Sequence, residues 1–170
     1  MKKLVALLLF VSVSTFTVSC TNDDDNIQYQ DNDTIAEVYD VSNVNFTYDN
    51  SVGYYIKRTF SPAIYSSDMV LVYQNTATDN GKKVWTLIPR TVYLSNGNEV
   101  DYTFDFTTSD VQIYAGGTFD LTNTEYVRNQ TFRILVIPAA QSRTQSTVDY
   151  SDYNAVVKHF NIKDGIVKSL

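Results

Sequence analysis

The strongest constraint on the fold of this chain is a pattern of short, alternating apolar runs. From residue 36 to residue 140 the apolar spacing of a helix is nearly absent. Runs rich in Val, Ile, Tyr, Phe and Thr are instead separated by Asn, Asp, Gly and Ser, which favours strands joined by turns. Strands are expected near residues 36–47, 52–60, 68–75, 84–94, 98–107, 110–115 and 131–138. This pattern predicts an all-β fold, an antiparallel two-sheet sandwich of about seven strands.

Length and composition fit one such domain. A chain of 170 residues, 44% of them hydrophobic, can bury a sizeable core without a metal or disulfide to help it fold. It holds one Cys and one His, which excludes a disulfide framework and the usual Cys/His zinc site. No dinucleotide, phosphate-loop or redox motif is present, so no cofactor is expected.

Two of the expected strands should be central in their sheet. Residues 69–73 and 132–137 are near-continuous apolar runs, which indicates strands covered on both faces. By contrast, Val100, Tyr102, Phe104 and Phe106 alternate with polar residues, so this strand should bury one face only.

Two Asn-Gly pairs predict type I′ hairpins, Asn80-Gly81 and Asn96-Gly97. A two-residue turn at Asn96-Gly97 sets Tyr93 opposite Val100 and Thr91 opposite Tyr102 on the apolar face. On the other face Arg90 then lies opposite Thr103 and between Asp101 and Asp105, outside the core, while Phe104 is buried. Pro89 implies an edge position or a bulge in its strand.

One helix is expected near the end of the chain. Ser151 can act as N-cap, and the helix dipole favours the acidic side chain of Asp152 in the first turn. An apolar stripe follows at helical spacing, formed by Tyr153, Val156, Val157 and Phe160. This helix should close over one end or edge of the sandwich and end at Asp164-Gly165, and Ile166-Val167 indicate a short last strand.

The N-terminus has the pattern of a secretory signal. Lys2 and Lys3 precede an apolar stretch over residues 4–13, and the segment ends Thr17-Val18-Ser19-Cys20. This ending resembles a bacterial lipobox, although Thr17 stands where Leu is commonest, and a plain signal peptide with an incidental Cys is the alternative. We therefore expect a signal peptide over residues 1–19, a lipidated tether over 20–35 beginning at Cys20, and the sandwich over 36–170.

The tether is acidic. Residues 21–56 hold eight acidic side chains and no Lys or Arg, whereas residues 57–170 hold eleven of each sign. Asp23, Asp24 and Asp25 resemble the export signal that Bacteroidota place after the lipidated Cys, although an ordinary acidic tether has the same composition. Asp33-Thr34-Ile35 resembles an O-glycosylation acceptor of the same phylum, with Thr34 as the modified residue.

Six runs of the domain carry a resemblance to a known family. They are Val70-Leu71-Val72-Tyr73, Val84-Trp85-Thr86-Leu87-Ile88-Pro89, Asp101-Tyr102-Thr103-Phe104-Asp105-Phe106, Val111-Gln112-Ile113-Tyr114, Thr131-Phe132-Arg133-Ile134-Leu135-Val136-Ile137-Pro138 and Tyr153-Asn154-Ala155-Val156. With these runs, the signal and the tether, the chain resembles a group of small Bacteroidota surface lipoproteins that are common in flavobacteria. A similar module follows collagen-like repeats in some surface proteins of that phylum. The resemblance implies a fold and a location on the outer membrane facing the cell exterior, and it supplies no catalytic or cofactor-binding residue.

No catalytic constellation stands out. His159 has no second His or available Cys beside it, and Asp101 and Asp105 lie about 13 Å apart along one strand, too far for a glycosidase pair. Gly116-Gly117 follows a strand without a helix or Lys after it, so we interpret it as a turn. The 13 tyrosines can stack on sugars or form core, and Tyr54-Tyr55 must point to opposite faces.

These features favour a cell-surface binding or adhesion module without enzymatic activity, held on the outer membrane by its lipid. Its ligand would be a glycan or a protein, and the net charge of −6 argues against nucleic acid. An accessory subunit of an outer-membrane uptake or secretion complex is the alternative, and a hydrolase built on carboxylates alone is a third. The first predicts an exposed aromatic patch on a sheet face or loop end, the second a large flat apolar area, and the third a cleft with convergent carboxylates.

Overall fold

A computed structural model of the chain describes residues 35–142 and 147–170. All of these residues belong to Asp31–Leu170, the second of two units into which the chain divides; the first is Met1–Gln30. The predicted signal peptide and residues 20–34 of the predicted tether lie outside the described residues.

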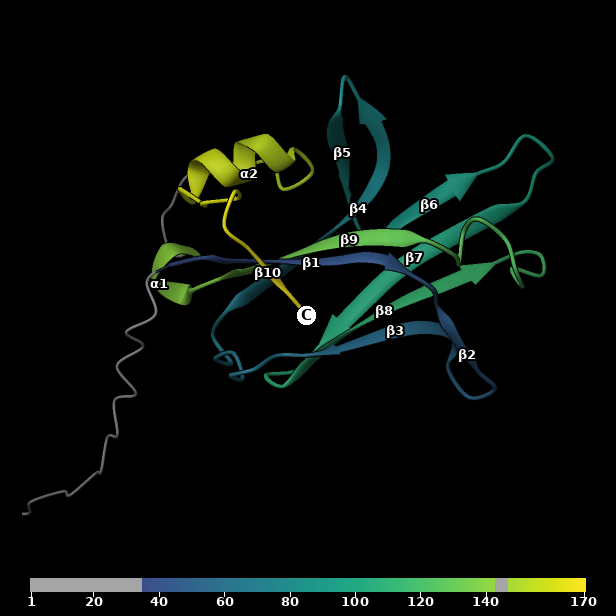
Figure 1. Cartoon of the computed structure of the whole chain (residues 1–170), viewed down its shortest axis with the longest axis horizontal. Helices are drawn as coiled ribbons and strands as arrows, with labels where there is room; N and C mark the ends of the chain where they lie inside the picture. The colour runs from purple at the N-terminus through teal and green to yellow at the C-terminus, as the bar shows by residue number, and fades with distance from the viewer. Residues whose placement is uncertain (1–34, 143–146) are drawn as a thin grey trace, which may run out of the picture. The chain divides into compact units, whose positions relative to one another are not determined.

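Within the described residues, ten strands form two five-stranded sheets that pack face to face (Figure 1). Sheet 1 consists, in spatial order, of β10 (Val167–Ser169), β1 (Glu37–Val44), β9 (Gln130–Ile137), β4 (Met69–Asp79) and β5 (Lys82–Leu87). Sheet 2 consists of β2 (Thr47–Asp49), β3 (Gly53–Thr59), β8 (Asp110–Gly117), β7 (Glu99–Phe106) and β6 (Arg90–Tyr93). Paired strands are antiparallel except β1 and β10, which are parallel. The predicted all-β fold with two sheets is confirmed, with ten strands in place of seven.

The additional strands arise because two predicted strands are divided. The run 36–47 breaks after β1, where the register against β9 shifts and Asn43 adopts a left-handed φ of 54°. The run 84–94 breaks at Ile88-Pro89, where the chain leaves β5 in sheet 1 and enters β6 in sheet 2. Proline has no backbone N–H to donate to a neighbouring strand, so Pro89 is compatible with the point where the chain passes from one sheet to the other. The predicted short last strand is β10, and it supplies the tenth.

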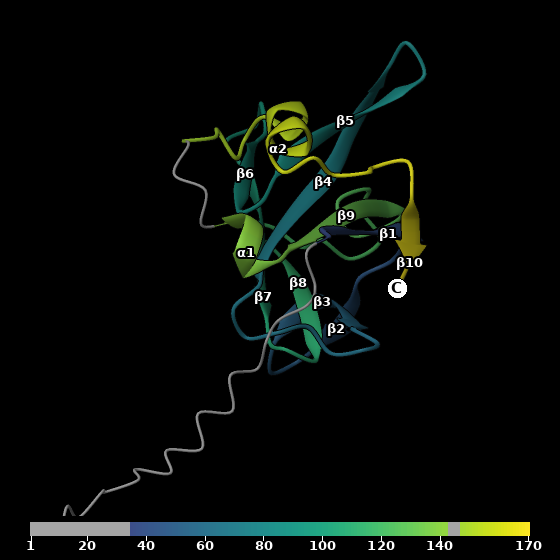
Figure 2. The same cartoon turned by 90° about the vertical axis from the view of Figure 1, so that its left-hand side faces the viewer.

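The two apolar runs do form central strands. In β9 the side chains of Phe132, Ile134 and Val136 point into the core between the sheets, and Leu135 and Ile137 point to the opposite face. All five are buried. The first three lie between the two sheets, and the other two are covered by helix α2 (Tyr153–His159), which packs on the outer face of sheet 1. Figure 2 shows α2 on the side of sheet 1 away from sheet 2.

Helix α2 carries the predicted apolar stripe but differs at both ends from the prediction. Asp152 is the N-cap, since its carboxylate accepts hydrogen bonds from the backbone N–H groups of Asn154 and Ala155. The helix ends at His159, and the left-handed Asn161 (φ 50°) follows its cap. It lies over a sheet face, where Tyr153, Val156 and Phe160 pack on Val38 and Tyr73, instead of over an end or edge. The short helix α1 (Ala139–Ser142) follows β9 directly.

The Asn80-Gly81 turn is confirmed, and the Asn96-Gly97 turn is different from the prediction. Asn80 and Gly81 form a two-residue loop with φ values of 47° and 78°, between the paired Asp79 and Lys82. At the second hairpin only Gly97 has a positive φ, and the backbone N–H of Leu94 donates to the carbonyl of Asn98. The loop therefore has three residues, a type I turn closed by a left-handed glycine.

The extra loop residue shifts the register of β6 by one. Val92 now lies opposite Val100 and faces the core, and Tyr93 lies opposite Glu99 with 76% of its surface exposed. The predicted placement of Tyr93 on the apolar face is wrong, because a one-residue shift turns every side chain of a strand to the other face.

Arg90 is displaced by the same shift. It lies opposite Tyr102 instead of Thr103, and its Nη1 donates to Oε1 of Gln74 at 3.0 Å. It is therefore not held outside between Asp101 and Asp105 as predicted. Phe104 is only half-buried and Phe106 is exposed, because β6 pairs with residues 99–102 of β7 and does not reach either of them.

The edge strand β10 is tied to β1 by an ion pair. Lys168 donates to Glu37, which also accepts from the hydroxyl of Tyr39. Burial by itself raises the pKa of Glu37, but the hydrogen bonds from Lys168 and Tyr39 outweigh it and hold the pKa below its ordinary 4.5.

Candidate ligand-binding cleft

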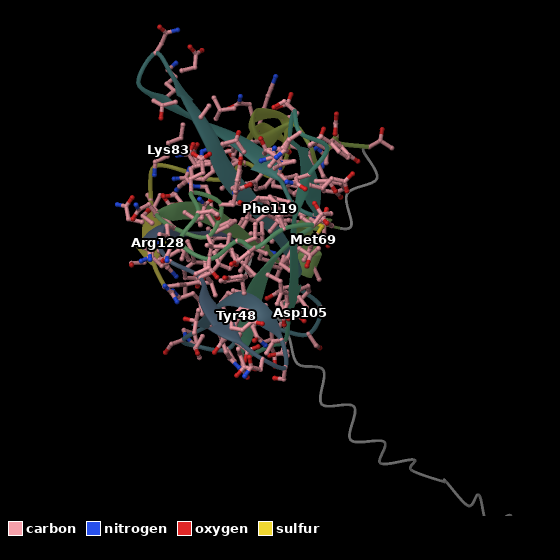
Figure 3. The ribbon with its side chains drawn as sticks, turned by 90° about the vertical axis from the view of Figure 1, so that its right-hand side faces the viewer. Tyr48, Met69, Lys83, Asp105, Phe119 and Arg128 are labelled. Atoms are coloured by element: carbon pink, nitrogen blue, oxygen red, sulfur yellow. The ribbon has the colours of Figure 1, made fainter. Side chains whose placement is uncertain are left out.

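A cleft of about 840 Å³ opens at one end of the sandwich. It lies where β1 ends and is lined by the β2–β3 hairpin, the end of β8 and the connection from β8 to β9, called here the 118–129 loop. In Figure 1 these segments meet at the right of the molecule, and Figure 3 looks onto that end, with Tyr48, Phe119 and Arg128 labelled. A concave site of this size is typical of small-ligand binding.

One wall of the cleft is a tyrosine pair on the β2–β3 hairpin. Tyr48 and Tyr54 are cross-strand partners, and their rings meet edge to face with centroids 4.9 Å apart. The hydroxyls of Tyr54 and Thr122 are hydrogen-bonded at 2.7 Å, which ties this hairpin to the 118–129 loop. Tyr48 itself is 59% exposed, so the pair presents a supported aromatic ring to solvent.

The opposite wall is the first part of the 118–129 loop. Phe119 lines the cleft and packs edge to face on Tyr126, with centroids 6.1 Å apart. Leu121 is buried against the end of β8, where a Cβ on Gly117 would come within 2.9 Å of its side chain. Gly116 and Gly117 are the last residues of strand β8, so the predicted turn at this pair is wrong.

Polar side chains of the same loop complete the cleft. Asp120 accepts hydrogen bonds from Thr122, and these bonds, side-chain and backbone, hold the pKa of Asp120 below its ordinary value, so it stays a carboxylate. Arg128 donates to the side-chain oxygen of Asn123. Asn45, at the end of β1, accepts from the backbone N–H of Asn129 at 2.9 Å.

A buried polar network supports the loop from beneath. Gln74 of β4, only 4% exposed, accepts from Arg90 and donates to Oε1 of Gln130 at 2.8 Å. The Gln130 amide nitrogen donates in turn to the backbone carbonyls of Glu125 and Arg128. The hydroxyl of Tyr102 donates to the carbonyl of Tyr126 at 2.7 Å. Side chains of four strands therefore hold the backbone of residues 125–128 in place.

A second polar cluster lies on the outer face of sheet 1, below α2. Arg133 is 9% exposed and donates through Nε and Nη2 to the two carboxylate oxygens of Asp40, at 2.7 and 2.9 Å. Its Nη1 donates to the hydroxyl of Tyr153, and its guanidinium lies 4.6 Å from the centre of the Trp85 ring. Burial alone lowers the pKa of Arg133, but the bonds to Asp40 and Tyr153 raise it above its ordinary value. The donors of Arg133 link β9 to Asp40 of β1 and to Tyr153 of α2, so we interpret this cluster as structural.

The residues singled out in the sequence are not brought together by the fold. Asp101 accepts from Thr91 and Asp105 from Tyr114, each on the outer face of sheet 2. His159 packs its ring edge to face on Phe160. Cys20, Asp23, Asp24, Asp25 and Thr34 lie outside the described residues.

Tyr54 and Tyr55 do point to opposite faces. Tyr54 lies opposite the buried Ala115 and reaches the cleft, whereas Tyr55 lies opposite Tyr114 on the outer face. Both are half-buried. Sequence reasoning did not single out Tyr48, Phe119 or Asp120, and the only signal for them was the abundance of aromatic residues in short polar segments.

Across residues 35–142 and 147–170, no group of three His, Cys, Asp or Glu side chains is arranged to hold a metal ion. No helix in the same part of the chain is long and apolar enough to cross a membrane. Comparison of the sequence and structure with known protein families, curated proteins and solved structures finds no match.

Proposed function

We propose that this protein is a lipid-anchored binding module of the bacterial cell surface, whose cleft takes an extracellular ligand without converting it. Cys20 carries the lipid, Asp23, Asp24 and Asp25 direct export to the outer face of the outer membrane, and Thr34 is an O-glycosylation site in the tether. The resemblance to small Bacteroidota surface lipoproteins supports the same location.

The observation that carries the proposal is the position of the cleft along the sandwich. The described chain begins at Ile35 and enters the sandwich at Glu37, and the cleft opens past the other end of the same strand, at Asn45. The eight residues of β1 separate these ends by roughly 25 Å. A lipid attached upstream of β1 therefore favours a cleft that faces away from the membrane, open to an extracellular ligand.

The residues that line the cleft support binding over hydrolysis. Glycoside hydrolysis commonly uses two carboxyl groups about 5–9.5 Å apart. Asp120 is the one carboxylate among the lining residues, and Thr122 already hydrogen-bonds to it. A carboxylate hydrolase is therefore the less supported hypothesis.

The distribution of exposed apolar side chains favours a binding module over a subunit with a broad docking face. Tyr93 lies in β6, Val84 in the β4–β5 hairpin and Ile166 before β10. The other exposed large apolar side chains of the described residues are likewise spread over several segments, including the β2–β3 hairpin, β7 and β10. A docked subunit needs one contiguous apolar area beyond a few hundred Å².

The anchor and the exposure are tested in a Bacteroidota host that expresses the full chain. Metabolic labelling with a clickable fatty acid should label the wild type and leave Cys20→Ser unlabelled. Protease added to intact cells should remove the wild-type domain and spare a triple variant with Ala at positions 23, 24 and 25. Label that persists in Cys20→Ser, or equal shaving of the wild type and the triple variant, contradicts the proposed location.

A further inference from the structure

The exposed ring of Tyr48 is supported by neighbouring side chains in the unliganded protein. The edge-to-face contact with Tyr54 supports one side of it, and the bond from Tyr54 to Thr122 fixes that support. A rigid tyrosine offers a large amphipathic contact at a low cost in conformational entropy. The free part of the ring is an apolar platform at the rim of a polar cleft, which suits a ligand with an apolar face and polar edges.

The charges around this platform balance. Asp120 and Arg128 are the acidic and the basic residue that line the cleft. The other polar groups of its lining side chains are amides and hydroxyls. The field of the cleft therefore does not select a charged ligand. A carboxylate accepts hydrogen bonds from hydroxyl groups, and amide and guanidinium N–H groups donate to hydroxyl oxygens. This donor and acceptor set matches a ligand rich in hydroxyls.

The dimensions of the site favour a small ligand over a folded partner. A stable protein interface removes about 800 Å² of surface from each partner and is usually broad. The cleft is instead a concave volume of about 840 Å³, closed on two sides by the β2–β3 hairpin and the 118–129 loop. One or two sugar rings are the size of ligand that such a volume encloses.

We propose that the cleft binds an uncharged pyranose unit of an extracellular glycan, with the apolar face of the sugar on Tyr48 and its hydroxyls on Asp120 and Arg128. This inference rests on the proposed function and adds the ligand class. Tyr48 is the stacking residue and Asp120 the main acceptor. Phe119 is a second aromatic residue that lines the same cleft.

The test uses Asp31–Leu170 as a soluble protein, because both sheets, α2 and the core of the described chain belong to this unit. It is applied to an array of neutral oligosaccharides, uronic-acid oligosaccharides and peptides, and the best ligand is then titrated by calorimetry. Tyr48→Ala and Asp120→Asn should each weaken neutral-glycan binding at least about tenfold. Tyr93→Ala is the matched control, since it removes a tyrosine that is even more exposed than Tyr48 and lies on a different strand, away from the cleft. The affinity of this variant should stay at the wild-type value. Equal unfolding midpoints of all four proteins verify that they are folded.

Salt dependence separates this ligand class from charged ones. Affinity for an uncharged sugar should change less than about twofold between roughly 0.05 and 0.5 M salt. Preference for uronic-acid oligosaccharides or peptides, lost in Tyr48→Ala, would overturn the ligand class and leave the proposed binding function standing. Binding that Tyr48→Ala leaves intact would overturn the cleft as the binding site. No binding to any class on the array would overturn the proposed binding function itself.

Discussion

The register of β6 against β7 determines which of two adjacent side chains, Val92 or Tyr93, faces the core. With the three-residue loop, Val92 packs against the core and Tyr93 is 76% exposed. With the two-residue turn expected from Asn96-Gly97, the two side chains would exchange faces. Val, Tyr and Thr all favour strands, so replacing each residue in turn by Thr changes the intrinsic strand preference little, and burial decides the outcome.

The expected magnitudes follow from burial. Val92→Thr places a hydroxyl among apolar neighbours, which costs about 1–3 kcal/mol in fully buried sites, and half-burial puts it near 1 kcal/mol. Tyr93→Thr should change the free energy of unfolding by less than about 0.5 kcal/mol. Arg90→Met removes a charged donor from buried Gln74 and should cost about 1.5 kcal/mol, where an exposed ion pair would cost under about 1.

Urea unfolding of Asp31–Leu170, followed by the fluorescence of the single Trp85, measures all three. Equal slopes against urea verify that the unfolded states are comparable. A larger loss for Tyr93→Thr than for Val92→Thr would refute the three-residue loop, and a cost near zero for Arg90→Met would refute its inward placement.

The same unfolding measurements check four further expectations. Asp152→Ala should cost about 1 kcal/mol through the lost N-cap, and Ser151→Ala clearly less. Asp40→Ala should cost about 3 kcal/mol, because it leaves a nearly buried arginine without its counter-ion. The pKa of Glu37 is depressed in the folded protein, so the stability that Glu37 contributes is present above pH 4.5 and is lost on acidification. In Glu37→Gln the free energy of unfolding should therefore fall less steeply as the pH is lowered below 4.5. Gly117→Ala should cost about 1 kcal/mol and weaken ligand binding, because its Cβ meets buried Leu121.

Alternating apolar residues were sufficient to predict most of the fold. The strands that carry strong patterns, β4, β7 and β9, lie where they were predicted, because burial of one or both faces leaves few other arrangements for such runs. The register of β6 was not predictable in this way. Its pattern is compatible with either face, since Val92 and Tyr93 are both apolar, and the choice depends on whether Asn96 adopts a positive φ, which it does not.

The cleft could be predicted only in outline. The abundance of tyrosine indicated an exposed aromatic patch, but Tyr48 and Phe119 are 71 positions apart and line the same cleft because β3 and β8 pair. Nothing in the local sequence marks the 118–129 loop as a wall, because its position depends on side chains from other strands. Long-range pairing of this kind is visible in a structure and not in a single sequence.

The polar network beneath the cleft connects the stability of the sandwich with the shape of the site. A glutamine between two sheets destabilises a core unless both of its amide groups find partners, and Gln74 finds them in Arg90 and Gln130. Gln130 then uses its own amide to hold two carbonyls of the 118–129 loop. An apolar residue at position 74 could fill the same space. It would not hydrogen-bond to Gln130, so the side chain of Gln130 would lose the contact that orients it toward those carbonyls. The network therefore gives a reason for a polar residue at this place in the core. It fixes the backbone of residues 125–128, of which Val127 and Arg128 line the cleft, and a site for a small ligand requires such support.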